Sequence, residues 1–90
     1  SFRPITDAQK KQMNINYGVE VMKVNSGALK DAGVSRGFII QRINDNNINT
    51  LDDLQKAVKN ASTSKDPVLY IQGVWPTGKK AYFAVPLQKD

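Results

Sequence analysis

Short runs of β-branched and aromatic residues, separated by turn residues, constrain this chain more than any other feature. The clearest runs cover residues 38–43, 68–74 and 80–87, and a weaker run covers residues 18–24. Such runs are typical of strands, because these side chains pack well on a pleated surface. Pro76-Thr77-Gly78 is a natural turn between the last two runs. The sequence therefore predicts a mainly β domain, with Ile48 as a candidate for one further, very short strand.

One segment, residues 51 to about 61, has the periodicity of a long helix. Its apolar residues recur at helical spacing and form one face: Leu51, Leu54, Ala57, Val58 and Ala61. Thr50 or Asn49 is suited to cap this helix, and Asp52 and Asp53 lie in its first turn, where negative charge is favourable. We therefore expect the helix to bury one side.

Two shorter helical segments are expected in the first third of the chain. Thr6 is suited to cap a short helix that ends at Gln12, and Gly33 is suited to end a helical turn over residues 28–32. A break is expected at Asn25-Ser26-Gly27. The fold class that follows is mixed mainly-β (α+β), a small barrel or sandwich. It has five or six short strands, one main helix at about 51–61 and one or two short helical turns.

The 90 residues suffice for one domain, and they include no cysteine and no histidine. Disulfides, thiolate zinc sites, cysteine nucleophiles and His-containing triads are therefore excluded within this chain. We expect no catalytic residues, no metal and no cofactor. No apolar run approaches the roughly 18 residues of a membrane span. Because the chain opens at Ser1 without a methionine, we expect it to be a piece of a longer protein, with any targeting segment elsewhere.

Thirteen Lys and Arg against eight Asp and Glu give a net charge of +5. A basic balance is compatible with nucleic-acid binding. The only basic doublets are Lys10-Lys11 and Lys79-Lys80, however, and the other cations are scattered. This favours a solvated surface, and a small basic nucleic-acid-binding domain stays a remote alternative.

Three polar or aromatic features have a functional and a structural interpretation. Asp52-Asp53 could be an acid pair, but adjacent helical residues point in different directions, which favours a role at the helix start. Asn44-Asp45-Asn46-Asn47 lacks the glycine and closing glutamate of a calcium loop, which favours a polar turn. Trp75 could bind a ligand, but we favour the interpretation that its side chain covers the end of the hairpin.

The order of several motifs resembles a PDZ domain of the bacterial Do/HtrA (DegP-like) serine proteases. The resembling segments are Asn16-Tyr17-Gly18-Val19-Glu20-Val21, Ser26-Gly27-Ala28, Ala32-Gly33-Val34, Gly37, Ile40, Ile43-Asn44, and the helix with Leu54 and Val58. Ile5-Thr6-Asp7 resembles the segment that precedes such domains. The resemblance covers nearly all of residues 13–87. It divides the chain into a lead-in strand and short helix over residues 1–12 and a PDZ-like domain over residues 13–90.

The sequence departs from the family pattern at five positions. Gly27 stands where the family usually has proline, Phe38 where it has aspartate, and Asp45 where it has glycine. In the loop before residue 19, Asn16 stands where many members have glycine, and Tyr17 where many have a small aliphatic residue. A PDZ-shaped domain that does not bind peptide, and serves as a spacer or oligomer contact, is therefore an open alternative.

The resemblance also implies a peptide-binding site. The backbone N–H groups of the loop Asn16, Tyr17, Gly18 and Val19 would receive a peptide carboxylate. The peptide would lie as an added strand beside residues 19–24, next to the main helix. The implied groove and pocket residues are Tyr17, Val19, Val21, Leu51, Gln55, Val58 and Lys59. For each apolar member, core packing is the alternative.

The function implied by the resemblance is a peptide-binding module of a periplasmic serine protease of the bacterial cell envelope. It would hold exposed C-termini or unfolded segments and position or regulate a separate protease domain of a homo-oligomeric parent. We expect no nucleic-acid partner and no membrane insertion. The chain ends soon after its last predicted strand, which suits the C-terminal PDZ of such a protease. A PDZ domain of another envelope protease or of a secretion component is the nearest alternative.

Overall fold

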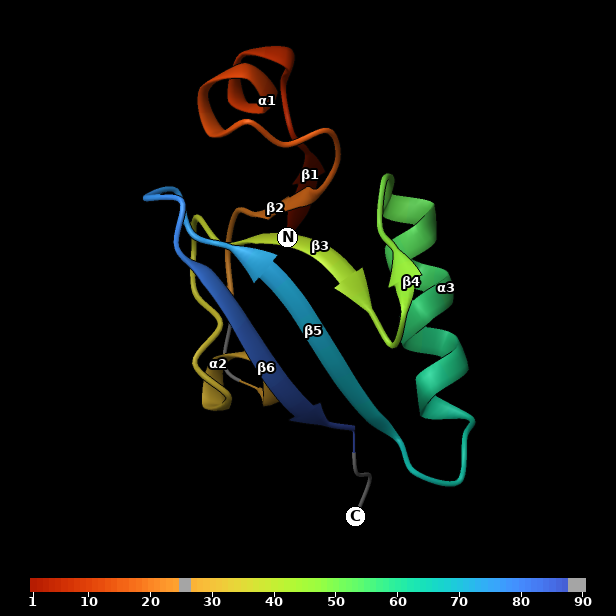
Figure 1. Cartoon of the computed structure of the whole chain (residues 1–90). Helices are drawn as coiled ribbons and strands as arrows, with labels where there is room; N and C mark the ends of the chain where they lie inside the picture. The colour runs from red at the N-terminus through yellow and green to blue at the C-terminus, as the bar shows by residue number, and fades with distance from the viewer. Residues whose placement is uncertain (25–26, 88–90) are drawn as a thin grey trace.

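The computed structural model describes residues 1–24 and 27–87, and six strands of this part form one antiparallel sheet (Figure 1). The strands are β1 (Phe2–Pro4), β2 (Val19–Val21), β3 (Ile39–Ile43), β4 (Asn46–Asn47), β5 (Val68–Val74) and β6 (Lys80–Pro86). The helices are α1 (Asp7–Met13), α2 (Ala28–Asp31) and α3 (Leu51–Ser62). The strand order is β1-β2-β3-β5-β6, with β4 paired to β3. The predicted α+β class is confirmed, with an open sheet bounded by β1 and β6.

The boundaries differ from expectation by a few residues. The second strand is only Val19–Val21, because its pairing covers just three residues of β1 and two residues of β3. The expected strand at Ile48 lies one residue earlier, at Asn46–Asn47, and Ile48 is a buried side chain after it. The predicted break at Asn25-Ser26 lies outside the described residues.

Helix α3 begins with a capping box. The Thr50 hydroxyl accepts a hydrogen bond from the Asp53 N–H at 3.1 Å, and the Asp53 carboxylate accepts from the N–H groups of Asn49 and Thr50 at 3.0 and 3.2 Å. The hydrogen bond from Asn49, above all, lowers the pKa of Asp53 below its usual value. Asp52 instead forms an ion pair with Lys56 at 3.1 Å. The two carboxylates therefore serve the start of the helix, as expected.

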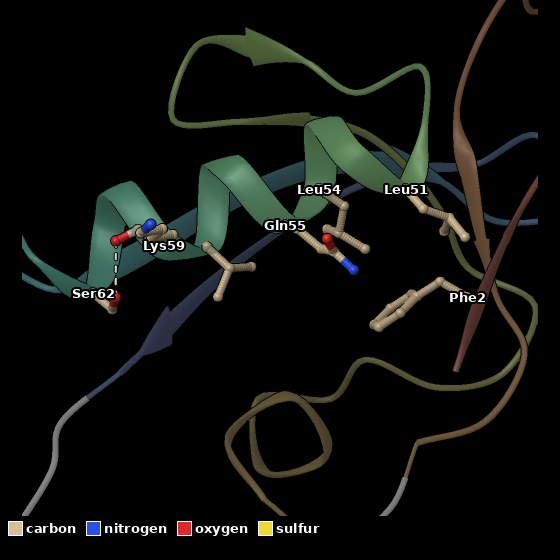
Figure 2. A pocket seen from close by; sticks show the side chains of 7 residues that line it. Phe2, Leu51, Leu54, Gln55, Lys59 and Ser62 are labelled. Carbon is tan, nitrogen blue, oxygen red and sulfur yellow. Dashed lines mark hydrogen bonds between the residues drawn. The ribbon is translucent and has the colours of Figure 1, made fainter.

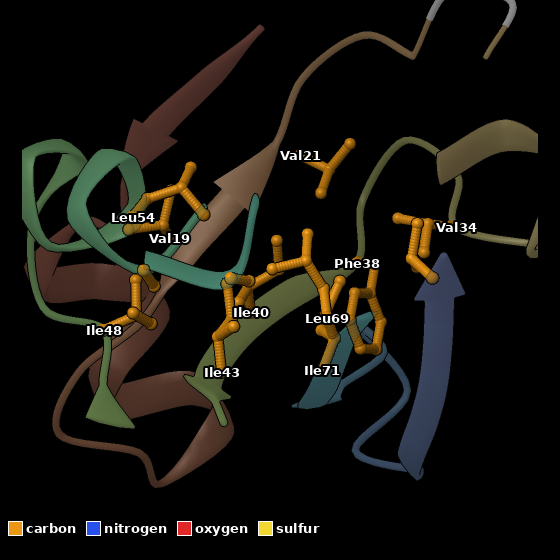
Figure 3. Packing of buried hydrophobic residues seen from close by; sticks show 13 residues of the cluster. Val19, Val21, Val34, Phe38, Ile40, Ile43, Ile48, Leu54, Leu69 and Ile71 are labelled. Atoms are coloured by element: carbon orange, nitrogen blue, oxygen red, sulfur yellow. The ribbon is translucent and has the colours of Figure 1, made fainter. Parts of the chain in front are cut away.

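The main core lies between the sheet and α3 (Figure 3). The largest fully buried side chains on this side come mostly from the inner strands: Val19, Val21, Phe38, Ile40, Ile43 and Ile71. Leu54, Ala57 and Ala61 of α3 complete it, as their helical spacing predicts. Ile39 and Val74 point to the opposite face, where they form a smaller cluster with Ile5.

Phe38, the residue that replaces the family's aspartate, is fully buried in an aromatic group. Its ring centroid lies 4.9 Å from that of Trp75 and 5.1 Å from that of Phe83. Trp75 thus packs at the end of the β5–β6 hairpin, and its structural interpretation is confirmed. This departure from the family pattern therefore supplies apolar packing.

The turn between β3 and β4 is polar. Asn44 and Asp45 have φ values of 49° and 70°, which suit a tight hairpin turn. The Asn44 side chain accepts the Tyr70 N–H at 2.9 Å and donates to the Val68 carbonyl at 3.2 Å. Its amide therefore connects the turn to β5, which confirms the turn interpretation.

Gly33→Val should destabilise the domain by about 1 kcal/mol or more. Gly33 follows α2 at a φ of 102°, which a β-branched residue rarely adopts, and an added Cβ would lie 3.4 Å from Cε1 of Phe83. Urea unfolding measures the loss. Gly33→Asn is the matched control and should cost less, because asparagine tolerates positive φ. An unchanged unfolding midpoint for the valine variant would contradict the described end of α2.

Candidate functional site

Strand β2 is not the free edge that the sequence suggested for peptide addition. It pairs with β1 on one side, where Pro4 faces Val19, and with β3 on the other, where Val19 faces Ile40. The side chains of Val19 and Val21 are both 0% exposed. The prediction that they line an open groove is therefore wrong, because the lead-in residues form the edge strand instead.

The loop that precedes β2 packs against its neighbours. The Gly18 carbonyl accepts the Ile5 N–H at 3.4 Å, and the Tyr17 carbonyl accepts a hydrogen bond from the Gln41 side chain at 3.2 Å. A Cβ at Gly18 would lie 2.6 Å from Cγ2 of Ile39, which shows how closely this loop lies on β3. Asn16 is exposed beside it. The loop Asn16–Val19 therefore connects α1 to the sheet and does not line the groove described next.

A groove of about 510 Å³ lies between β1 and α3 (Figure 2). Its lining residues come from both elements: Phe2, Leu51, Leu54, Gln55, Val58, Lys59 and Ser62. The ring of Phe2 extends toward α3 in Figure 2, and Leu54 and Gln55 lie across from it. The structure thus brings together four of the predicted site residues, Leu51, Gln55, Val58 and Lys59.

The groove has an apolar floor and a polar rim. Phe2 faces Val21 in the β1–β2 register, so both side chains lie on the side of the sheet that faces α3. Leu54 is nearly buried beneath, and Leu51 is 38% exposed at the helix start. Exposed Gln55 and Lys59 are on the rim. Such a surface suits a chain with apolar side chains and a polar backbone.

The lining of two hollows gives the direction of β1 relative to α3, the two walls of the groove. Phe2 shares the groove with residues from both halves of α3, from Leu51 to Ser62. Pro4, at the other end of β1, lies beside a separate small hollow that Asn49 also lines, just before α3. The start of β1 therefore lies farther along α3 than the end of β1 does.

Sequence reasoning missed Phe2, Leu54 and Ser62 as groove residues. Phe2 was treated as part of an extended lead-in, and Leu54 only as part of the apolar helix face. The signal available in the sequence was the short extended segment Phe2-Arg3-Pro4-Ile5 with an aromatic residue at its start. Because Arg3 reaches Glu20 at 3.1 Å, that segment also carries an ion pair on the side of the strand away from Phe2.

The face of the β5–β6 hairpin that points away from the main core exposes two tyrosines. Tyr70 is 55% exposed and Tyr82 is 69% exposed, whereas Phe83 contributes to the aromatic group in the core. The hollow beside Tyr82 has a volume of only about 150 Å³. Tyr82 and Phe83, which are neighbours in β6, therefore point to opposite faces of the sheet.

Within residues 1–24 and 27–87, no three His, Cys, Asp or Glu side chains gather in a way that could hold a metal ion. No helix in this part of the chain has the length and apolar character needed to span a bilayer.

Comparison with known proteins places this geometry in a family. A family model described as a PDZ-like domain matches residues 1–63, a range that includes both walls of the groove. No curated protein sequence matches the chain. Among solved structures, the chain is similar to the HtrA3 PDZ domain bound to a phage-derived ligand (FGRWV). The TM-score is 0.77 at 21% identity, over 96% of this chain and 78% of that one, which shows a shared fold.

Proposed function

Because the chain belongs to the PDZ-like domain family, we propose that it is a non-catalytic module that binds peptides in the β1–α3 groove. One observation carries this proposal: an edge strand lies beside an apolar helix face. An extended peptide can add to such a strand through backbone hydrogen bonds, while alternate side chains enter the groove. The HtrA3 PDZ domain, which has a similar fold, is bound to a phage-derived ligand (FGRWV), and this supports a peptide as the ligand.

The groove favours a peptide with an apolar C-terminus. A ligand that runs antiparallel to β1 directs its C-terminus toward the start of β1, in the groove that Val58 and Lys59 also line. There Val58 and Phe2 offer apolar contact to the last side chain, and Lys59 offers positive charge to the carboxylate. Leu51 offers no hydrogen bond, so an apolar side chain is favoured there also. The carboxylate position that we propose is therefore this end of the groove, and not the expected loop at residues 16–19.

The parent protein that we propose is a periplasmic serine protease of the bacterial cell envelope, of the Do/HtrA type. In it the domain would hold C-termini or unfolded segments and regulate or position a separate protease domain in a homo-oligomer, as its C-terminal PDZ. The motif order of the sequence and the similarity to the HtrA3 PDZ domain support this parent. A PDZ domain of another envelope protease or secretion component would use the same groove.

Titration with an apolar-ended peptide tests the proposal. We expect a dissociation constant of about micromolar, and binding of the C-terminal amide about threefold weaker, because Lys59 is exposed and its charge is screened. Lys59→Gln should make the acid and amide equal. Lys56→Gln is the matched control, because Lys56 lies on α3 outside the groove. If neither peptide binds the folded domain at millimolar concentration, the spacer alternative replaces this proposal.

A further inference from the structure

A second hollow lies beside α2 and has a volume of about 430 Å³. It shares no lining residue with the groove between β1 and α3, and Figure 1 shows α2 on the left and α3 on the right. Seven residues line it, from the segment after β2, from α2 and from the segment before β3: Met22, Lys23, Val24, Lys30, Val34, Ser35 and Arg36. Three of the seven are cationic and none is acidic, so we call this site the basic hollow. Asp31, although it is part of α2, does not line it.

The fold brings the three cations of the basic hollow together from separate segments. Lys23 follows β2, Lys30 belongs to α2, and Arg36 precedes β3. The Gly37 N–H donates to the Val21 carbonyl at 2.9 Å, which holds the segment before β3 alongside the end of β2. All three cations are exposed, and none of them forms an ion pair within residues 1–24 and 27–87. Like charges gathered in this way repel one another, and a bound anion would relieve that repulsion.

The floor of the basic hollow is apolar and recessed. Val34 is 1% exposed, and Met22 and Val24 are half-buried. Val34 belongs to the main core and Val24 packs against it, so the packing of the domain supports this floor from below. Methionine adapts readily to apolar groups of different shapes. The basic hollow can therefore receive an apolar side chain while anionic groups of the same ligand contact the cations around it.

These features favour one class of ligand. No aromatic ring lines the basic hollow, so the bases of a single-stranded nucleic acid would find no surface to stack on. A bilayer surface is bound by apolar side chains that reach into it beside cations. In the part of the chain that the structure describes, the large exposed hydrophobic side chains are Leu51, Tyr70 and Tyr82, and none of them lines this site. A polypeptide with carboxylates on both sides of an apolar residue supplies both groups that the basic hollow can bind.

We propose that the basic hollow is a second binding site, for an acidic polypeptide segment in which an apolar residue is flanked by aspartate or glutamate. The apolar side chain contacts Met22 and Val34, and the carboxylates pair with Lys23, Lys30 and Arg36. This site is separate from the proposed peptide groove, so the domain can hold a groove ligand and an acidic segment at the same time. Because the cations are exposed, the binding is weak and sensitive to salt.

An acidic probe tests this proposal on the 90-residue chain. The probe is a labelled five-residue peptide, Glu-Glu-Leu-Glu-Glu, acetylated and amidated so that it has no terminal charge. Fluorescence anisotropy should give a dissociation constant of about 0.1 mM in about 20 mM salt, and about tenfold weaker binding in about 0.5 M salt. Arg36→Glu should weaken binding by about tenfold or more. Lys65→Glu is the matched control, because it changes the net charge equally at an exposed residue outside the basic hollow, and should have little effect.

Several results would overturn the assignment. They are no binding of the probe at millimolar concentration, binding that does not depend on salt, and equal losses from Arg36→Glu and Lys65→Glu. A probe with serine in place of leucine should bind about threefold weaker or worse, and equal affinity would contradict the apolar floor. Tighter binding of a thymidine octanucleotide, or of vesicles that contain an anionic phospholipid, lost in a folded Arg36→Glu domain, would assign the basic hollow to that ligand instead.

Chemical shifts of the wild-type domain locate the probe without any variant. Titration with the leucine probe should move the amide signals of Lys23, Lys30 and Ser35 most, because they belong to the basic hollow. The signals of Phe2 and Val58, in the groove, should move little. The reverse pattern would show that the probe binds in the groove and would overturn the second site, while the proposed groove would stand.

Discussion

Val58→Glu should weaken binding of an apolar-ended peptide by tenfold or more while the domain stays folded. Val58 is half-buried, packs against the core from α3 and lines the groove near Phe2. A glutamate there would place a carboxylate in an apolar site that also receives the peptide carboxylate, and like charges in such a site repel strongly. Fluorescence anisotropy with a labelled peptide measures the loss of affinity, and circular dichroism measures the fold.

Asn60→Glu is the matched control for this substitution. Asn60 lies on the same helix, is exposed, and borders a different hollow together with Asp53 and Lys56. The control adds the same charge to α3 and should change the affinity little. Unchanged affinity in a folded Val58→Glu domain would contradict the groove as the binding site. Unfolding of that variant would show that Val58 is a closed-core residue.

Gly73→Ala should destabilise the domain by about 3 kcal/mol or more. Gly73 pairs with Ile40 on one side and Ala81 on the other, at the centre of the sheet. A Cβ there would overlap the carbonyl oxygen of Ile39 and lie 2.6 Å from Cζ of the buried Phe38 ring. A backbone oxygen cannot move aside without disturbing the β3–β5 ladder. Because small domains have only about 5–15 kcal/mol of stability, the loss should be plain in urea unfolding.

Gly78→Ala is the comparison that isolates this steric effect. Gly78 lies in the β5–β6 turn at a φ of 90°, and nothing lies within 4 Å of the position of an added Cβ. Its replacement should cost only about 1 kcal/mol, from backbone conformation alone. If the two alanine variants unfold at the same urea concentration, the close approach of Gly73 to β3 is not as described.

Local patterns were enough to predict most of the elements. The alternation of apolar residues over 68–74, and the helical spacing from Leu51 to Ala61, depend on residues close in the sequence, and both elements are where they were expected. The cap at Thr50 and the positive φ of Gly33 were likewise readable, because each follows from one or two neighbouring residues. Core residues on these elements could therefore be assigned without a structure.

The position of the groove could not be predicted from such local patterns. Whether β2 is an edge strand depends on the pairing of Phe2–Pro4 with residues 19–21, far along the chain, and three residues carry too weak a pattern to show this. The family motif around Gly18 predicted a carboxylate-binding loop, but this loop is packed against Ile39. The helix side of the site, Leu51, Gln55, Val58 and Lys59, was predictable because one amphipathic helix carries all four. The strand side required the sheet order.

The Phe2 backbone amide tests the central claim, that a peptide adds to β1 in the groove beside α3. In heteronuclear NMR spectra, titration with an apolar-ended peptide should shift the amide signals of Phe2, Gln55 and Val58 most. It should also slow hydrogen exchange at Phe2, because this N–H becomes hydrogen-bonded to the ligand. The signals of Tyr17 and Tyr82 should move little. Shifts centred on Tyr17 and Gly18, with Phe2 exchange unchanged, would contradict the account.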